Sequence, residues 1–365
     1  MGVRNFYKFL QKYAYTVIEN KKYSDYSGKI LGIDANLLLY KLLYKNFNKN
    51  INNNENNEDY EIYYLELINI ICNSYEFNIK FIFVFDGKTP DIKKKTVNDR
   101  KAKRQKASED LSIINNDILE LEKYLNNIDN NDDNNNDNNN DNIINNLEDN
   151  NKMNELLEKK NSCMSQSLNL KYKLITETKE FLTMCGIPFI DSMNEADSQL
   201  AYLSKNNLID GIISNDYDIL TFGGKKLLIN FFDYYQNITE ISLDKLLNKL
   251  ELTYDNFIEL CILMGTDYSD KPSLKFEDIY TNIKNNKKYL YNNVRLPANL
   301  DIILITKYFK DCYANNYTQD SFNEQLKISS MCKDKQKIIN FINIKKNIYI
   351  KYRHIKKICL LIYEY

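Results

Sequence analysis

Residues 81–87 read FIFVFDG, five apolar side chains followed by an aspartate and a glycine. Such a short apolar run, rich in β-forming side chains, is typical of a strand that is buried on both faces in a parallel sheet. Residues 31–34, LGID, have the same form and also end in an aspartate. Because open α/β sheets bind their ligands at the carboxyl ends of the strands, the two stretches predict a site that includes Asp34 and Asp86.

Further apolar runs extend this pattern along the chain, at residues 187–190, 211–214 and 227–231. Helical patterns lie between and around them, at residues 6–19, 35–47, 63–73, 170–185, 195–205 and 254–264. Strands that alternate with helices favour parallel pairing, since each helix returns the chain to the same edge of the sheet. We therefore expect an α/β fold with a mostly parallel central sheet flanked by helices.

The composition excludes several classes of protein. Of 365 residues, 43% are hydrophobic, enough for a sizeable core, and the net charge is -1. The 7 cysteines are scattered and His354 is the only histidine, so we expect no structural zinc, no disulfide framework and no histidine-based nucleophile. No apolar stretch is long enough to span a membrane, and the first ten residues carry charges where a signal peptide needs an apolar block. We expect an intracellular protein, not a secreted one.

Residues 129–142 consist only of asparagine and aspartate. A run without apolar side chains cannot offset the entropy of ordering, so we expect a disordered insertion over about residues 125–151. The five aspartates of the run could suggest a calcium loop, but the glycine and the closing glutamate of an EF-hand are both missing. The solvated loop is the better interpretation.

Acidic side chains fall at the ends of the predicted strands and helices. There are seven of them: Asp34, Asp86, Glu195, Asp197, Asp216, Asp218 and Asp267. Four form acid-x-acid pairs, whose carboxylates can point to one side of an extended segment or share the start of a helix. Carboxylates gathered at one sheet edge repel one another unless cations neutralise them, and oxygen ligands select hard ions such as Mg²⁺ or Mn²⁺. The set predicts a two-metal site for phosphodiester hydrolysis.

Each acidic residue also has a simpler explanation. Glu195 could cap the N-terminus of a helix, and the aspartates at strand ends could form Asx turns. These explanations suffice for any one residue, but they leave unexplained why all seven fall at such ends.

A basic stretch follows Asp86. Residues 93–106 contain eight basic side chains and one acidic side chain. A solvated, charged helix is the usual explanation of such a run. Because this run begins beside a predicted metal site, its side chains can also hold phosphate oxygens next to the metals. We expect contacts with nucleic acid here, Lys103 and Arg104 included.

Several of these stretches occur together and in order. They are Met1-Gly2-Val3 with Phe6 and Leu10, LGIDANLLLY (31–40), FVFDGKTPDIKKKTVNDRKAKR (83–104), GIPFIDSMNEADSQLAYL (186–203), GIISNDYDILTFGGKKLL (211–228) and LTYDNFIELCILMGTDYSD (252–270). In this order the chain resembles the flap endonuclease branch of the structure-specific 5′-nuclease superfamily. The resemblance covers most of residues 1–270 apart from the insertion.

The resemblance implies a role for each matching residue. Asp34, Asp86, Glu195 and Asp197 would serve a first metal, and Asp216, Asp218 and Asp267 a second. Lys93 and Arg100 match a basic pair that contacts the scissile phosphate. Tyr40 matches an aromatic on which the unpaired base beside the cut stacks, and Gly2, once Met1 is removed, matches a residue near the active site. The ions are expected to be two Mg²⁺, for which Mn²⁺ substitutes.

The resemblance also implies an organisation with a PIN-like 5′-nuclease fold and a helical arch. We expect nuclease regions at 1–107 and 186–270, arch helices with the insertion at 108–185, and a divergent helical region at 271–365. After Asp270 the chain lacks the glycines with which the family holds duplex DNA, and residues 344–354 are basic and aromatic without a sliding-clamp peptide. We expect a monomer.

The expected function is Mg²⁺-dependent cleavage of 5′ flaps or related branched DNA in replication or repair. Two alternatives remain open. One is a 5′→3′ exonuclease or a gap or junction nuclease of the same superfamily, and the other is a catalytically silent DNA-binding scaffold. We expect the protein in the nucleus, or at a cytoplasmic site of DNA replication if its source is viral.

Overall fold

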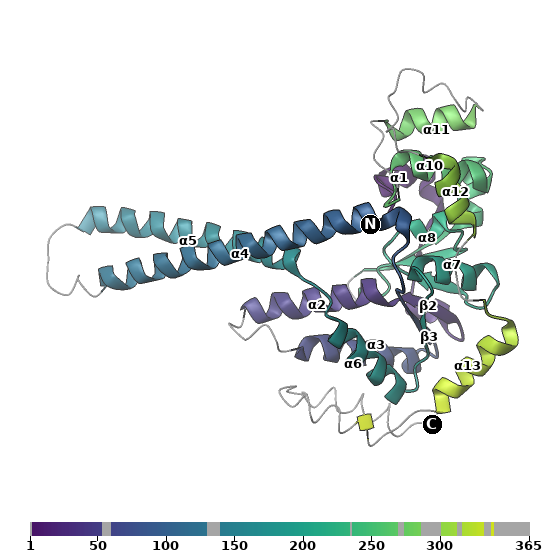
Figure 1. The fold of residues 1–365 in the computed structure, drawn as a ribbon, viewed down its shortest axis with the longest axis horizontal. Coiled ribbons are helices and arrows are strands. Elements are labelled where there is room, and N and C mark those ends of the chain that lie inside the picture. Colours follow the sequence, from purple (N-terminus) through teal and green to yellow (C-terminus); the bar gives the residue numbers. More distant parts are fainter. Residues whose placement is uncertain are drawn as a thin grey trace. The chain divides into compact units, whose positions relative to one another are not determined.

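The computed structural model describes residues 2–52, 60–129, 139–233, 236–268, 274–285, 301–311, 316–331 and 337–338. The chain forms two compact units. The first unit comprises Met1–Lys94 and Lys171–Tyr365, and the second comprises Lys95–Leu170 (Figure 1). Among the described residues, no helix has the length and apolar character needed to cross a membrane.

The first unit is built on a seven-stranded sheet with the order β1-β7-β6-β5-β2-β3-β4. Its strands are β1 (Ile18–Lys21), β2 (Ile30–Asp34), β3 (Lys80–Phe85), β4 (Phe189–Asp191), β5 (Gly211–Ile213), β6 (Lys226–Ile229) and β7 (Ile238–Ser242). The neighbours from β6 to β4 pair in parallel, and only β7 and β1 add antiparallel pairs. The predicted α/β fold with a mostly parallel sheet is confirmed.

Helices of the first unit flank this sheet. They are α1 (Phe6–Tyr13), α2 (Ala35–Asn52), α3 (Glu61–Glu76), α6 (Tyr172–Met184), α7 (Ala196–Lys205), α8 (Asp218–Thr221), α9 (Leu243–Leu250), α10 (Tyr254–Met264), α11 (Phe276–Lys284), α12 (Ile302–Asp311) and α13 (Gln319–Met331). Short 3₁₀ turns occur at Tyr15–Val17, Tyr23–Tyr26 and Asp91–Lys93. The register brings Asp34 opposite Val84 and Ile33 opposite Ile213, so β2, β3 and β5 end at one edge of the sheet.

The prediction of a helix over residues 6–19 was wrong in its second half. Helix α1 ends at Tyr13, and Ile18–Lys21 is an edge strand that pairs antiparallel with β7. The segment is too short and polar to show a strand pattern in the sequence, because its conformation depends on its partner strand. Strand β7 was not predicted either.

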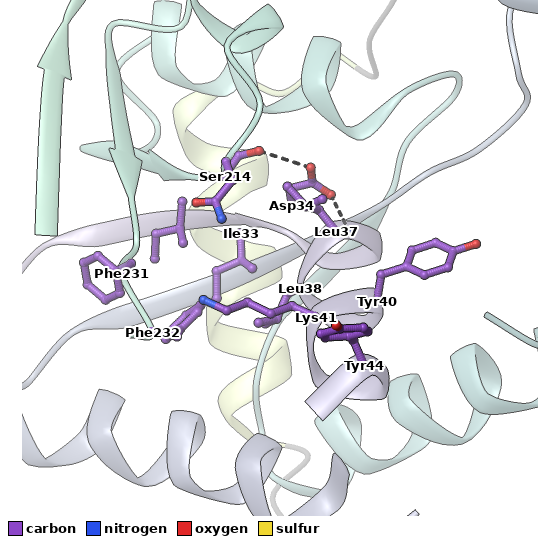
Figure 2. A pocket seen from close by; sticks show the side chains of 12 residues that line it. Ile33, Asp34, Leu37, Leu38, Tyr40, Lys41, Tyr44, Ser214, Phe231 and Phe232 are labelled. Carbon is purple, nitrogen blue, oxygen red and sulfur yellow. Dashed lines mark hydrogen bonds between the residues drawn. The ribbon is translucent and has the colours of Figure 1, made fainter. Parts of the chain in front are cut away.

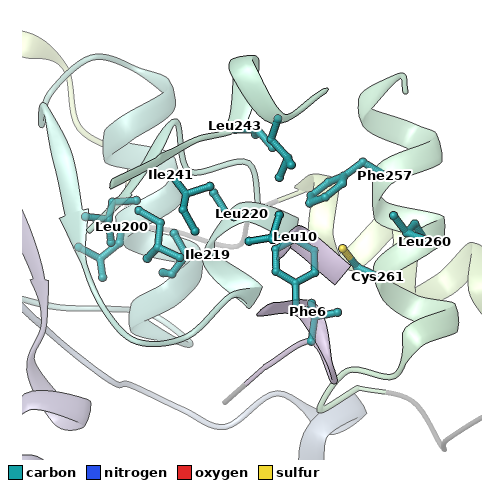
Figure 3. Packing of buried hydrophobic residues seen from close by; sticks show 14 of the residues in the cluster. Phe6, Leu10, Leu200, Ile219, Leu220, Ile241, Leu243, Phe257, Leu260 and Cys261 are labelled. Carbon is teal, nitrogen blue, oxygen red and sulfur yellow. The ribbon is translucent and has the colours of Figure 1, made fainter. Parts of the chain in front are cut away.

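Helix α1 fixes the N-terminal segment in the core. Phe6, Phe9 and Leu10 are fully buried in one apolar cluster with residues of α7, α8 and α10, part of which is drawn in Figure 3. Burial of each such side chain stabilises the fold by about 1.5–3 kcal/mol. The ring centre of Phe6 also lies 5.0 Å from that of Tyr217, which stands between Asp216 and Asp218 in the sequence. The core therefore supports the site directly.

The second unit is formed by helices α4 (Lys94–Asp129) and α5 (Asn139–Ser167). Along α4, buried and half-buried positions recur every three or four residues, at Ala107, Leu111, Ile114, Ile118 and Leu121. A matching stripe runs along α5, at residues 153, 156, 160 and 163. Heptad stripes on two consecutive helices are typical of an antiparallel helical hairpin, in which each stripe faces the other. Figure 1 shows the two helices alongside each other.

The expected disordered insertion over about residues 125–151 is corrected at its ends. Helix α4 continues to Asp129 and α5 begins at Asn139, while residues 130–138 lie outside the described residues. A helix that has already nucleated extends at low cost, and asparagine lowers its stability by only about 0.7 kcal/mol per residue. The compact unit, Lys95–Leu170, also begins and ends earlier than the expected arch at 108–185.

The C-terminal region contributes α12 to the first unit. Ile305, Tyr308 and Phe309 of this helix pack in an apolar cluster with residues of α8 and α10. The basic and aromatic stretch at residues 344–354 lies outside the described residues. The divergent region therefore packs on the nuclease core through α12 and also through α11 and α13, whose Ile279 and Phe322 are buried in the main apolar cluster.

Candidate active site

Asp34 and Asp86 extend from neighbouring strands of the sheet. Asp34 ends β2; its Oδ1 accepts a hydrogen bond from the backbone N–H of Leu37 (3.1 Å) and its Oδ2 one from the Ser214 hydroxyl (3.2 Å). Figure 2 shows both bonds. Asp86 follows β3 and accepts bonds from the Ala196 N–H (2.9 Å) and the Asn36 amide (2.8 Å). The bond to Ala196 links the end of β3 to the first turn of α7.

Gly87 allows the end of β3 to approach the start of α7 in this way. Its N–H donates to Asn194 O (2.6 Å) and to Ser192 Oγ (3.1 Å). A Cβ at this position would lie 2.0 Å from the carbonyl oxygen of Ser192, so only glycine permits the close approach. The turn after β3 is thereby held against the segment that leads to Glu195.

Glu195 is held by three donors. Its Oε1 accepts a bond from the Lys93 ammonium, and its Oε2 accepts bonds from the hydroxyls of Tyr268 (2.8 Å) and Tyr308 (2.9 Å). Glu195 occupies the N-cap position of α7, but its side chain makes no capping bond. The simpler explanation of Glu195 as a helix cap is therefore wrong. Its carboxylate is fixed with 7% exposure and points to Lys93.

Two aspartates have oxygen atoms without donors. Oδ1 of Asp197 and Oδ1 of Asp218 are buried and have no hydrogen-bond partner. Burial, and after it the carboxylate of Asp216, raises the pKa of both side chains well above the ordinary value. Buried oxygens without donors, among other carboxylates, are what a divalent cation binds. This donor set fits a hard metal ion.

Asp216 and Gly2 lie against each other. Oδ1 of Asp216 accepts a bond from the Asp218 N–H (2.9 Å), which is the Asx turn that the simpler explanation expected. Gly2 has a φ of 77°, and a Cβ there would lie 2.0 Å from Asp216 Oδ1. The chain therefore requires glycine at this position, next to an acidic residue of the site.

Lys93 supplies the positive charge among these carboxylates. Its ammonium bonds to Glu195, lies 3.9 Å from Asp267 Oδ2 and lies 5.1 Å from the ring centre of Tyr268. Burial lowers the pKa of Lys93, but the carboxylates, Glu195 first and Asp197 next, outweigh burial and raise the pKa above its ordinary value. Lys93 therefore stays charged.

The electrostatic strain of the cluster is clear at Asp34. Burial, and then repulsion from Asp86, raises the pKa of Asp34 to about 7. Within the described part of the chain, no three acidic, histidine or cysteine side chains already surround a single point as a coordination shell. The acidic side chains are gathered at one edge of the sheet, and the Lys93 ammonium lies among them.

The remaining predicted residues fall in two places. Tyr40 lies on α2, at the rim of a cavity that Asp34 also lines. Arg100, Lys103 and Arg104 lie on α4 in the helical unit. Lys103 is exposed, whereas Arg104 is half-buried and donates to Asn169 Oδ1 at 3.2 Å, so its guanidinium already has a partner within the hairpin.

Tyr268 and Tyr308 were missed as site residues. Tyr268 directly follows Asp267, and that position was the available signal. Tyr308 had none, because it lies in the divergent C-terminal region and reaches Glu195 only through the packing of α12. Asn36 and Ser214, which hold Asp86 and Asp34, were also missed.

Comparison with known proteins identifies the family. The XPG N-terminal domain model matches residues 1–107 and the XPG I-region model matches residues 186–267. Flap endonuclease 1-B of Oryza sativa subsp. indica is 29% identical over 274 residues, and flap endonuclease 1 of Glycine max is also 29% identical. Each alignment covers 74% of this chain, but only 58% of the rice protein and 62% of the soybean protein.

Solved structures share the fold. Flap endonuclease-1 from Methanococcus jannaschii has a TM-score of 0.61 at 21% identity, with 94% of this chain and 95% of that chain covered. The catalytic core of Rad2 in complex with DNA substrate has a TM-score of 0.61 at 18% identity, with 99% of each chain covered. The two family models and the shared fold agree: this chain belongs to the XPG and flap endonuclease superfamily.

Proposed function

We propose that the protein is a Mg²⁺-dependent 5′-nuclease that cleaves 5′ flaps or related branched DNA. One observation carries the proposal: buried oxygens of Asp197 and Asp218 lack donors, in a set of carboxylates at one sheet edge. Binding DNA alone does not require such a set, because acidic side chains repel phosphate. A site for metal ions that act on a phosphodiester explains it.

The residues divide between two tasks. We assign Asp34, Asp86, Glu195 and Asp197 to one Mg²⁺ and Asp216, Asp218 and Asp267 to a second, with Mn²⁺ as a substitute. When bound, such ions activate the attacking water and stabilise charge on the leaving oxygen. The protein's own part is to hold the carboxylates in place.

Lys93 has the second task. In the absence of DNA its ammonium balances the carboxylates through Glu195. A substrate phosphate bound at the site would offer the ammonium a new partner, so Lys93 would stabilise the charge that develops during cleavage. The bonds from Tyr268 and Tyr308 would keep Glu195 in place while Lys93 changes partner.

The helical unit supplies contacts to the DNA backbone. Arg100 and Lys103 lie in the basic first third of α4, and we assign them to phosphates of the substrate, with Arg104 as a further contact. Tyr40 provides an aromatic surface for an unpaired base, an interaction worth about 1–3 kcal/mol. We further propose that the protein acts as a monomer and, since its relatives include flap endonucleases of plants, that it acts in the nucleus.

A labelled 5′-flap substrate tests the proposal. We expect cleavage near the base of the flap in Mg²⁺ and none in EDTA. Flaps with a blocked 5′ end separate the alternatives: an exonuclease degrades only the free end, and a junction nuclease prefers a four-way junction. Binding without cleavage in Mg²⁺ or Mn²⁺ would indicate the silent scaffold and contradict the proposal.

A further inference from the structure

Asn36 stands beside the acidic cluster, in the first turn of α2 and two residues after Asp34. Its side-chain amide donates a hydrogen bond to Oδ2 of Asp86 at 2.8 Å. The reverse orientation of the amide would set two acceptors against each other, so the nitrogen faces Asp86. Asn36 therefore links the start of α2 to the end of β3, although it is not among the seven acidic residues assigned to the metals.

The oxygen of the same amide has no donor. Oδ1 of Asn36 is buried and accepts no hydrogen bond from any residue that the structure describes. A buried acceptor without a donor costs free energy, so a folded protein usually supplies it with a partner, which can be an ion. Among the described residues, the only other buried side-chain carbonyl or carboxylate oxygens in this condition are Oδ1 of Asp197 and Oδ1 of Asp218. The three atoms therefore ask for one explanation.

The planar amide keeps this oxygen near the carboxylates. The C–O and C–N bonds of an amide are about 1.2 and 1.3 Å long, so the hydrogen bond to Asp86 keeps Oδ1 of Asn36 within about 5 Å of Oδ2 of Asp86. Divalent cations bind their oxygen ligands at about 2.0–2.6 Å. A single ion can therefore contact both residues.

We propose that Oδ1 of Asn36 is a further ligand of the cation assigned to Asp34 and Asp86. The inference rests on the proposed function, and it adds a ligand from outside the acidic set. Amide oxygens, like carboxylate oxygens, suit hard ions such as Mg²⁺ and Mn²⁺. Because the amide is neutral, it adds a ligand without adding to the repulsion among the carboxylates.

A purely structural role of Asn36 leads to a different expectation. In that case the amide nitrogen holds Asp86 in place, and the oxygen binds nothing. Two substitutions separate the nitrogen from the oxygen. Leucine has nearly the shape of asparagine but lacks both atoms, whereas aspartate keeps the oxygen and lacks the donor.

The test measures Mn²⁺ binding without DNA. Isothermal titration calorimetry gives the dissociation constant, and the relaxation of water protons in saturating Mn²⁺ gives the number of water molecules on the bound ions. The proteins are the wild type, Asn36→Leu, Asn36→Asp and the control Asn215→Leu. Asn215 also adjoins an acidic residue of the site, but it is exposed and its Oδ1 already accepts a bond from the Asn230 N–H at 3.2 Å.

We expect Asn36→Leu to raise the dissociation constant for Mn²⁺ at least about tenfold, the lower end of the loss that changes around a metal site typically cause. The bound ions should gain one water molecule, because water replaces the lost oxygen. Asn36→Asp should keep the number of water molecules of the wild type, since its carboxylate supplies an oxygen. Asn215→Leu should match the wild type in both measurements.

Two results would overturn the inference. One is an unchanged number of water molecules in Asn36→Leu, which would mean that Oδ1 is not a ligand. The other is an added water molecule in both Asn36 variants, which would trace the change to the lost donor to Asp86. If the wild type binds Mn²⁺ and cleaves flaps but either result appears, only the assignment of Asn36 fails; if the wild type binds no Mn²⁺, the proposed function fails as well.

Discussion

The hydroxyl of Tyr308 donates a hydrogen bond to Oε2 of Glu195 at 2.9 Å, across 113 residues of sequence. Tyr308 belongs to α12, in a region without recognisable family motifs, whereas Glu195 lies in a matched motif. Helix α12 therefore completes the support of an acidic residue in the nuclease unit. Because a misplaced carboxylate weakens metal binding, this contact has a measurable consequence.

The variant Tyr308→Phe should bind Mn²⁺ more weakly. The Mn²⁺ concentration at half-saturation should rise about 10-fold, as is typical when an outer partner of a metal ligand is lost. Isothermal titration calorimetry in the absence of DNA measures this half-saturating concentration. Excess metal should restore cleavage. The control is Tyr280→Phe on α11, which loses a buried hydrogen bond to the carbonyl oxygen of Leu250 on α9 (3.1 Å). Equal half-saturating concentrations in the two variants would mean that Tyr308 has only a structural role.

Replacement of Lys93 by alanine should lower the single-turnover cleavage rate about 10²–10³-fold, as loss of one preorganised charge typically does. Metal affinity should stay the same or increase, because a positive charge leaves the carboxylates. Lys94→Ala is the matched control, since Lys94 is exposed and pairs with Asp91 (2.8 Å). If Lys93→Ala lost DNA affinity but kept the cleavage rate, Lys93 would be an ordinary phosphate contact.

The stability of the metal-free protein should fall as pH rises from about 4 to about 7. The pKa of Asp34 is raised from 3.8 to about 7, so in this range the folded state binds more protons than the unfolded state. The pKa values of Asp86, Asp197, Asp216 and Asp218 are raised as well and act in the same direction. Carboxylates with a lowered pKa, such as Glu19, lose their contribution at lower pH.

Urea unfolding in EDTA at pH 5 and pH 7.5 measures this dependence. Mg²⁺ at matched ionic strength should stabilise the protein more at pH 7.5, because it replaces protons at the same oxygens. Asp34→Asn should weaken the pH dependence. A stability that rises with pH in EDTA, unchanged by Asp34→Asn, would contradict the electrostatic account.

The helical hairpin should depend on its apolar stripe. Ile118 is 6% exposed, so Ile118→Asn places a polar group in the stripe. The free energy of unfolding of the hairpin should fall by about 1–3 kcal/mol. Its neighbour Leu119 is 52% exposed, and Leu119→Asn is the control. Hydrogen exchange should show faster exchange along α4 and α5 only in the first variant. Equal protection in both would show that the stripe is not packed.

The sequence predicted those parts of the fold that depend on local patterns. Residues 81–85 are apolar and β-forming throughout, and they form β3; residues 254–264 show helical periodicity and form α10 with the same bounds. Residues 18–21 show no strand pattern in the sequence. They form an edge strand because of their pairing with β7, not because of their own side chains. Strand β7 pairs on both sides, but its sequence ITEIS (238–242) has only two apolar side chains, so it shows no clear strand pattern either.

The site shows the same division. The acidic residues could be predicted because each follows a strand or opens or ends a helix, and the parallel sheet brings strand ends together. The partners of those acids could not, since Tyr308, Asn36 and Ser214 are ordinary polar residues until the fold places them. Lys93 was predicted as a phosphate contact, and its bond to Glu195 emerges only from the structure.

The central claim is that the carboxylates at the sheet edge carry metal-dependent cleavage of flap DNA. The most direct test is the single-turnover rate on a 5′-flap substrate in saturating Mg²⁺ for the wild type, Asp216→Ala and Asp191→Ala. Asp191 is the control: it ends β4, is exposed and pairs with Lys179 (2.6 Å). We predict a loss of at least about a thousandfold, or about 4 kcal/mol, for Asp216→Ala with DNA affinity unchanged or tighter, and a rate close to the wild type for Asp191→Ala. A rate for Asp216→Ala within about tenfold of the wild type would contradict the account.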